Sequence, residues 1–208
     1  CGWKVPLAPS WVIGKGTRTI AILKDNGIDG FDIDIKSNVS KEDMKNASSY
    51  ITVRGNNIYC PHCEMETPIT SIRRDRKGED GETIYGLRHW EKNEFIPREN
   101  DVFQERLYCI RYVSDDGRYY IAPTEEDLER EEKVVDLLSE RFSEWQEAGY
   151  IPSARIEAGY NTTQPIRERG WAYWHQLFNP RQLLINGLFS KAASEMANGQ
   201  KEKAMGVL

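Results

Sequence analysis

Apolar and polar residues alternate over short stretches in the first third of the chain. The segment 31–36 places Phe31, Ile33 and Ile35 on one side and charged residues on the other, a period of two that predicts a strand. The β-rich segment 17–24 predicts a second strand. Residues 25–30 between them contain Asn26-Gly27, which favours the positive φ angles of a tight turn. Together these segments predict a β-hairpin.

Two further hairpins are predicted by the same kind of signal, a turn sequence between two β-rich segments. One joins residues 50–53 to 58–60 through Gly55-Asn56-Asn57, and the other joins 107–113 to 118–122 through Ser114-Asp115-Asp116-Gly117.

After residue 123 the period of the apolar positions becomes helical. Thr124 with Asp127 three residues later resembles a capping box, with Asp in place of the usual Glu. One face of a long helix then carries Leu128, Val135, Leu138, Phe142 and Trp145, and Gly149 is suited to end it. Asn179-Pro180 predicts the cap and first turn of a last helix, which continues through Leu183, Leu184, Leu188 and Ala192.

Cys60-Pro61-His62-Cys63 lies at the end of a predicted hairpin, where two thiolates on a tight turn suit half of a tetrahedral zinc site. The run Cys63-Glu-Met-Glu-Thr-Pro-Ile matches Cys1-Gly-Trp-Lys-Val-Pro-Leu, a cysteine that leads through proline into a strand. We therefore expect a zinc ribbon with ligands Cys1, Cys60 and Cys63, and a fourth cysteine three residues upstream of Cys1. The alternatives are a redox pair or a chance repeat with free thiols. His62 reads as a solvent-facing residue of the turn and Cys109 as a small buried apolar one.

Strand-forming segments precede helical ones, which indicates an α+β fold. We expect zinc-ribbon-like β-hairpins in residues 1–72, a loop and a further β-hairpin in 73–123, and a helical region in 124–208. A chain of 208 residues buries roughly 70% of its unfolded surface, so no disulfide framework is needed for a core.

The net charge and its distribution along the chain exclude one class of nucleic-acid-binding protein. The formal net charge is −5, and residues 125–147 alone hold ten acids and three bases. A chain that is basic over its whole surface is therefore excluded, but a local basic face is not. With no run of 18 apolar residues and no signal peptide, we expect a cytoplasmic protein without membrane contact. Because the first residue is Cys1, we also expect the chain to be a piece of a longer protein.

Two groups of basic residues are candidate DNA contacts. Arg73, Arg74, Arg76 and Lys77 fall within a polar segment, 73–81, that predicts an exposed loop; the alternative is a solvated loop without a ligand. The second group combines arginines, which grip phosphates, with aromatic residues, which stack on bases: Arg167, Arg169, Trp171, Tyr173, Trp174, His175 and Arg181. Trp171, Trp174 and Phe178 also recur at helical spacing, so packing in a core is the favoured interpretation of the tryptophans.

Four segments make the chain resemble large adenine-specific DNA methylases that carry an internal zinc ribbon. They are the start from Cys1-Gly2 to Pro6-Leu7 and Trp11, the knuckle at Cys60, the stretch from Glu105-Arg106-Leu107-Tyr108 through Arg118-Tyr119-Tyr120 to 122–128, and 174–184, where the family often has Thr in place of Asn179. In that family a Gly-rich S-adenosylmethionine loop precedes such a region and a D/N-P-P-Y motif follows it. Neither motif occurs in this sequence.

The resemblance implies the central insert of an S-adenosylmethionine-dependent adenine-specific DNA methyltransferase, with DNA and the catalytic domain of the same protein as partners. A methylase flips its target base and holds the duplex with other surfaces, so the insert is expected to assist DNA engagement or target positioning. The chain alone is expected to be inactive. The alternative is a scaffold or protein-interaction module that does not touch nucleic acid. An independent hydrolase or redox enzyme finds no supporting motif among the three histidines.

Overall fold

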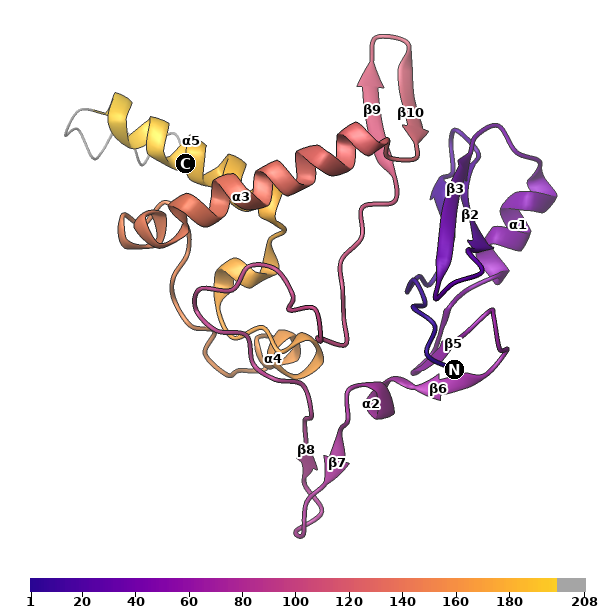
Figure 1. Ribbon diagram of the computed structural model, residues 1–208, viewed down its shortest axis with the longest axis horizontal. Helices are drawn as coiled ribbons and strands as arrows, with labels where there is room; N and C mark the ends of the chain where they lie inside the picture. The colour runs from indigo at the N-terminus through magenta and orange to yellow at the C-terminus, as the bar shows by residue number, and fades with distance from the viewer. Residues whose placement is uncertain (198–208) are drawn as a thin grey trace. The chain divides into compact units, whose positions relative to one another are not determined.

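The computed structural model describes residues 1–197 and confirms the α+β class, with β-hairpins toward the N-terminus and helices toward the C-terminus (Figure 1). The chain divides into two compact units. The first comprises Cys1–Ile84 and Arg106–Glu125, and the second comprises Tyr85–Glu105 and the chain from Glu126 onward. Each unit has its own hydrophobic core and is described separately.

The main sheet of the first unit is antiparallel with the order β1-β2-β3, formed by Val12–Gly14, Thr19–Asp25 and Phe31–Lys36. The hairpin predicted from the alternation is thus confirmed, with β3 at the predicted residues. Its turn is closed by the Asn26 side chain, whose Oδ1 accepts hydrogen bonds from the backbone N–H groups of Ile28, Asp29 and Gly30. Trp11, Ile20 and Ala21 form the core of this sheet together with Ala8 and Ala47.

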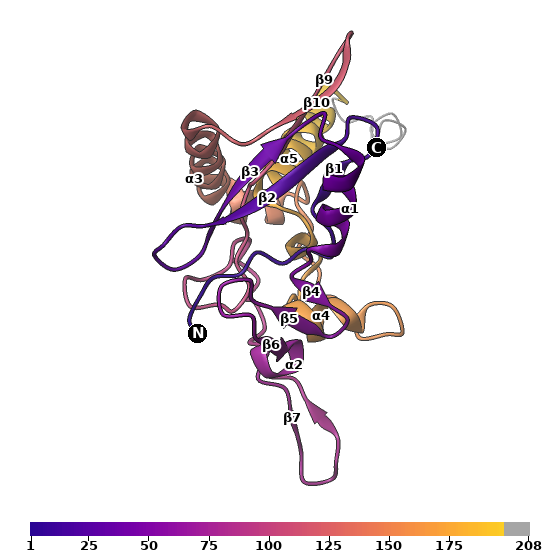
Figure 2. The same cartoon turned by 90° about the vertical axis from the view of Figure 1, so that its right-hand side faces the viewer.

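Helix α1 (Lys41–Ser49), which lies beside the sheet in Figure 2, is absent from the sequence predictions. The sequence does carry a signal for the start of this helix, the pair Ser40 and Asp43. The Ser40 side chain accepts a hydrogen bond from the Asp43 N–H, and the Asp43 carboxylate accepts one from the Ser40 N–H, so the two form a capping box. The helix has a single buried residue, Ala47. So few apolar positions leave no period in the sequence from which to detect it.

Smaller strands complete the first unit. β4 (Val53–Arg54), β5 (Asn57–Tyr59) and β6 (Glu66–Pro68) make a three-stranded antiparallel sheet, and β9 (Ile110–Ser114) pairs with β10 (Gly117–Ile121), so both predicted hairpins form. After the short helix α2 (Ile69–Ile72), β7 (Arg76–Lys77) pairs with β8 (Thr83–Ile84). The plain loop predicted at 73–81 is therefore wrong. That segment forms one side and the tip of a hairpin whose strands are too short to show alternation.

Helices dominate the second unit: α3 (Glu125–Glu147), α4 (Thr163–Arg169), the 3₁₀ helix η1 (Trp174–Leu177) and α5 (Pro180–Met196). Both long helices were predicted, and Asn179 forms the expected cap of α5 through its hydrogen bond from the Gln182 N–H. Leu138, Phe142 and Trp145 of α3 are buried against Ile151 and Leu183. The predicted apolar face is correct for this half of α3, whereas Leu128 near its start is exposed.

The segment 85–105 forms no strand and is held by charged groups instead. The Arg88 guanidinium donates two hydrogen bonds to Asp101, at 2.6 and 2.5 Å, and one to Glu94 at 2.7 Å. Partial burial would raise the pKa values of both carboxyl groups, but the hydrogen bonds from Arg88 bring both below their usual range. Arg98 pairs with Glu94 and Glu91 beside them. This network orders a segment that has no backbone ladder.

Buried polar groups attach the same segment to the helices. His175 Nε2 lies 2.9 Å from the Glu94 carbonyl oxygen and its Nδ1 lies 3.3 Å from Gln146 Nε2, contacts that the neutral ring satisfies with its proton on Nε2. Burial lowers the pKa of His175, which favours this neutral form. Gln176 donates to the carbonyl oxygen of Glu91 at 2.7 Å. His175 and Gln176 are therefore structural residues of the second unit.

No helix within residues 1–197 is both long and apolar enough to span a membrane.

The contact between α3 and α5 depends on Gly187. A Cβ atom at this position would overlap the six-membered ring of Trp145, which therefore rests directly on the backbone of α5. We expect Gly187→Ala to lower the free energy of unfolding by about 1–3 kcal/mol, because overpacking outweighs the better helix propensity of alanine. Chemical denaturation measures the change. Ser194→Ala, at an exposed position of the same helix, is the control and should be neutral; an equal effect of both substitutions would contradict the close contact.

Candidate functional site

The three cysteines named as zinc ligands lie together in the first unit. Their sulfur atoms are all within 4.8 Å of one another, and Cys1 Sγ is 3.7 Å from Cys60 Sγ. Tetrahedral coordination with Zn–S bonds of about 2.3 Å requires sulfur atoms about 3.8 Å apart. The residues present therefore fit three corners of a zinc tetrahedron. Cys1 and Cys60 come from segments 59 positions apart, so the fold itself assembles the cluster.

The turn at Cys60–Cys63 has the backbone of a ligand-binding knuckle. The Cys60 N–H donates to the Met65 carbonyl oxygen at 3.0 Å, and the Glu64 N–H donates to the Cys60 carbonyl oxygen at 2.8 Å. To close this turn Glu64 adopts a φ of 60°, in the left-handed region that favours glycine. The two thiols of the turn are thereby brought to the same side.

A comparable backbone conformation follows Cys1, since Gly2 has a φ of 83°. The residue after each cysteine of the sequence repeat is thus left-handed, which gives the repeat a structural basis. The expectation that both cysteines lead into strands is correct only for the second copy. Glu66–Pro68 forms β6, but residues 4–6 belong to no strand.

Polar anchors hold the N-terminal segment beside the knuckle. The buried Thr52 hydroxyl donates to the Pro6 carbonyl oxygen at 2.5 Å and accepts from the Ala8 N–H at 2.9 Å. The Tyr59 N–H in turn donates to the Thr52 carbonyl oxygen at 2.8 Å, next to Cys60 in the sequence. Thr52 therefore connects the segment that carries Cys1 to β5, which ends directly before Cys60.

Aromatic stacking adds a second connection. The Trp3 ring stacks on the His62 ring with centroids 3.7 Å apart and planes 14° apart. His62 Nδ1 lies 2.8 Å from Asp25 Oδ2, and this hydrogen bond lowers the pKa of the Asp25 carboxyl. His62 is exposed, as expected, and it also contacts two other segments of the unit. The sequence held no signal for this contact beyond the histidine itself.

The electrostatics of the cluster favour thiolate at one position. A hydrogen bond from the Met65 backbone lowers the pKa of Cys63 against the opposing effect of desolvation, and the Cys60 side chain contributes further. The fourth cysteine, Cys109, is only partly buried, and burial raises its pKa. Cys109 lies outside the group of three in the part of the chain that the structure describes.

Of the four basic residues predicted at 73–77 as DNA contacts, one is paired within the fold and three are exposed. Arg73 pairs with Asp75 at 3.0 Å and its side chain is only 13% exposed, so its guanidinium is engaged within the fold. Arg74, Arg76 and Lys77 are exposed. The last two form β7, on the hairpin that extends beyond α2 (Figures 1 and 2). These three cations are the part of the group that remains accessible to a phosphate.

The second basic group is engaged with neighbouring side chains. Arg181 pairs with Glu131 at 2.5 Å, while Arg167 and Arg169 lie over the rings of Tyr85 and Phe103 at 5.0 and 4.9 Å. The core interpretation of the tryptophans is wrong for Trp174, which is 39% exposed because residues 174–177 form a 3₁₀ helix with a different period. Trp171 is partly buried and meets Trp90 edge to face.

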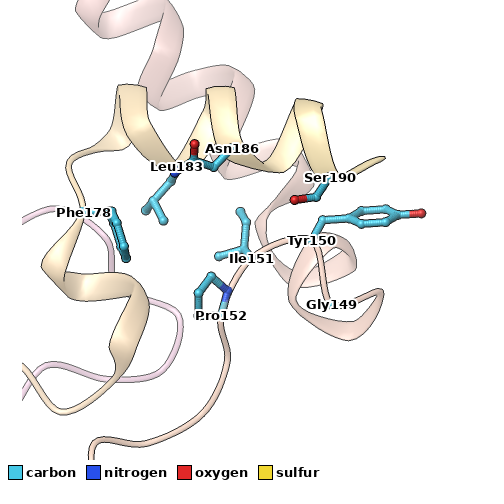
Figure 3. Close-up of a pocket in the computed structure, with 8 residues that line it drawn as sticks. All are labelled: Gly149, Tyr150, Ile151, Pro152, Phe178, Leu183, Asn186 and Ser190. Atoms are coloured by element: carbon cyan, nitrogen blue, oxygen red, sulfur yellow. The ribbon is translucent and has the colours of Figure 1, made fainter. Parts of the chain in front are cut away.

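A hollow of about 300 Å³ lies in the second unit between the loop 149–152 and α5 (Figure 3). Phe178, Leu183 and Ile151 point into it, while Asn186 and Ser190 line the side formed by α5. None of its lining residues is an acid, a basic residue or a cysteine. The hollow is a packing feature without the groups that catalysis or metal binding needs.

Comparison of this chain with protein-family models, curated proteins and solved structures found no match.

The cluster predicts metal binding that depends on its own thiols. We expect the chain to bind Co²⁺ with thiolate-to-metal absorption and to release it to Zn²⁺, which prefers thiolate ligands in this geometry. Cys63→Ser should weaken binding at least about tenfold, because a thiolate ligand is lost. Cys109→Ser is the matched control and should bind like the parent chain. Equal titration curves for the two variants would contradict a site at Cys1, Cys60 and Cys63.

The backbone at Glu64 predicts a stabilising substitution. Glycine has no Cβ to oppose the left-handed φ, so Glu64→Gly should raise the free energy of unfolding by about 0.5–1 kcal/mol after its greater unfolded-state entropy is included. Met65→Gly, next to it and without a positive φ, should be destabilising. Thermal or urea unfolding in the presence of a chelator tests the pair without a contribution from metal. A destabilised Glu64→Gly variant would argue against the knuckle conformation.

Proposed function

We propose that this chain is a zinc-stabilised module of an adenine-specific DNA methylase, and that it helps the protein to engage DNA. The observation that carries the proposal is the convergence of Cys1, Cys60 and Cys63. Two of these thiols belong to one turn and the third comes from a segment 59 positions away, an arrangement that favours a structural metal site. The resemblance of four segments to the methylase family supplies the enzyme class.

Zinc held by the three thiolates would supply a structural cross-link between the N-terminal segment and the β5–β6 hairpin. The chain's own contacts already set this geometry. Thr52 positions residues 6–8, Trp3 stacks on His62, and Lys4 pairs with Asp29 at 2.6 Å. The polar and aromatic contacts bring the ligands together, and metal coordination would lock them there.

The β7–β8 hairpin is the best-supported DNA contact in this proposal. Arg74, Arg76 and Lys77 are exposed on one short segment, which suits contact with successive phosphates. Acidic residues at the hairpin tip, Glu79 and Asp80, limit the approach to the side of the hairpin. Contacts of this kind position a protein on the duplex but do not read its sequence.

Methyl transfer is assigned to another part of the protein. The chain carries neither a Gly-rich cofactor loop nor a D/N-P-P-Y motif to hold the target amine. Its fully buried histidine, His175, is occupied by Glu94 and Gln146. The role of this chain is therefore to hold and position, with S-adenosylmethionine bound elsewhere in the protein.

A scaffold that never touches DNA is the second candidate, and the ion pairs favour it. Arg73 is committed to Asp75 and Arg181 to Glu131, so two of the seven candidate DNA contacts are neutralised within the fold. The ten acids of the α3 region repel phosphate over much of the second unit. On this reading the chain only holds the catalytic domain in place.

The dependence of DNA binding on salt separates the two functions. Duplex DNA binding is measured by fluorescence anisotropy at several salt concentrations for the chain and for the variant R74A/R76A/K77A. If the hairpin contacts three phosphates, the variant should bind more weakly, and the slope of log K against log salt should fall by up to about 2.7.

The control variant K36A/K41A/K45A removes the same number of exposed cations from β3 and α1 of the same unit. It should keep the slope of the parent chain. Equal slopes for the two triple variants would overturn the hairpin contact, and no measurable salt-dependent binding by any of the proteins would favour the scaffold.

A further inference from the structure

The thiol cluster holds two sulfur atoms that a small movement would bring to bonding distance. All four cysteines of the chain lie among the described residues and are free. Cys1 Sγ lies 3.7 Å from Cys60 Sγ, and a disulfide requires an S–S distance of about 2.05 Å. The two atoms therefore need to approach each other by about 1.7 Å. Rotation of one cysteine side chain to another staggered position covers such a distance.

Cys1 is the partner that is free to make this approach. Cys60 is buried, and the backbone hydrogen bonds of its N–H and carbonyl oxygen fix the turn that carries it. Cys1 is exposed and lies outside any strand. The first backbone hydrogen bond of its segment comes three residues later, from the Lys4 N–H to the Asp29 carbonyl oxygen at 2.7 Å. Movement of Cys1 toward Cys60 therefore leaves the backbone hydrogen bonds of both segments in place.

We propose that Cys1 and Cys60 form a reversible oxidation site, at which hydrogen peroxide joins the two thiols in a disulfide and thereby releases zinc. The release rests on the zinc site of the proposed function, whereas the disulfide needs only the two cysteines. A redox pair inferred from the C-x-x-C spacing alone would instead be Cys60 and Cys63. The structure favours the pair across segments, because the hydrogen-bonded turn holds both of its own cysteines while Cys1 can move.

The oxidation proceeds in two steps that consume one peroxide molecule. The exposed Cys1 thiolate attacks one peroxide oxygen, the O–O bond breaks, and the departing hydroxide takes up the proton of the Cys1 thiol to leave as water. Cys1 then carries a sulfenic acid. The Cys60 thiolate attacks the sulfur of this group, the S–O bond breaks, and a second water leaves with the proton of the Cys60 thiol as the disulfide forms. The two thiols together lose two electrons, which reduce the peroxide to two waters.

The disulfide removes two of the three metal ligands. Zinc binds cysteine as the thiolate, and a sulfur atom in a disulfide has lost that charge. Only Cys63 of the cluster then remains as a ligand, so the metal should leave. The new bond joins the same two segments that the metal would join, the N-terminal segment and the β5–β6 hairpin. The oxidised chain should therefore lose its metal and keep the fold of the first unit.

Mass mapping of the peroxide-treated chain without reductant identifies the bond, and a chromophoric chelator measures the released zinc. The zinc-loaded chain should form the Cys1–Cys60 bridge and lose two of its four free thiols. It should release about one zinc per chain. A dithiol reductant should restore both thiols and zinc binding. The same treatment of the metal-free chain should give the same bridge, which separates the oxidation site from the zinc site.

Cysteine variants of the metal-free chain distinguish this bridge from one within the turn. Cys63→Ser removes the local alternative and should form the Cys1–Cys60 bridge within about threefold of the parent rate. Cys1→Ser should lose thiols at least about tenfold more slowly, because Cys60 is buried and its partner is gone. Cys109→Ser, which changes a cysteine outside the cluster, is the matched control and should react like the parent chain.

Thermal unfolding gives a second readout that a local bridge would not move. The Cys1–Cys60 bond joins positions 59 residues apart, so it restricts the unfolded chain over a long loop. The oxidised metal-free chain should melt at least about 5 °C above the reduced metal-free chain. Oxidised Cys63→Ser should show the same rise, and Cys1→Ser a smaller one or none.

Three results would overturn the proposal. One is a parent chain whose main bridge is Cys60–Cys63, and another is a Cys1→Ser variant that oxidises at the parent rate. The third is a cluster whose thiols react no faster than Cys109. A reduced chain that binds no zinc would overturn the zinc module and the release with it, whereas a Cys1–Cys60 bridge in that chain would still support the oxidation site.

Discussion

The N-terminal segment of the first unit has no strand partner before β1, so its position depends on a few specific contacts. The Thr52 hydroxyl is the central one. It is fully buried, it donates to the Pro6 carbonyl oxygen, and it accepts from the Ala8 N–H. The backbone carbonyl oxygen of Thr52 accepts from the N–H of Tyr59, the residue before Cys60. Loss of a buried hydroxyl's partners costs about 1–3 kcal/mol. The geometry of the thiol cluster, and with it the proposed function, depends on this side chain together with the contacts of Lys4 and His62 to the β2–β3 hairpin.

The cluster could be predicted from the sequence because its signal is local. The C-x-x-C spacing and the repeat around Cys1 are both visible without knowledge of the fold. The contacts that bring Cys1 to Cys60 were invisible, since Thr52 and Trp3 act on residues more than forty positions away. The same division holds for the fold. The strand Phe31–Lys36 and the helices α3 and α5 could be predicted from the regular spacing of their apolar residues. The residues of the ion-pair network around Arg88 and Asp101 have no regular spacing, so the sequence did not predict it.

Basic residues illustrate why composition alone misleads about binding. Arg73 and Arg76 look equivalent in the sequence, yet Arg73 folds back onto Asp75 two residues away and Arg76 stays exposed. An arginine that is already paired must give up that partner before it can bind a phosphate. The candidate DNA surface therefore shrinks to one side of one hairpin. This smaller surface is consistent with a module that contributes to binding without dominating it.

The contact of Gly187 with Trp145 has a consequence for how the second unit presents itself. With an indole ring seated directly on its backbone, α5 has one allowed rotation about its own axis. Turning the helix by a single residue, about 100°, would bring a side chain onto the ring. The absence of one methyl group on the inner side thus decides which residues point outward on the far side. The contact between Gly187 and Trp145 in the core thus fixes the rotation of α5, and with it the set of side chains that α5 exposes to solvent or to a partner.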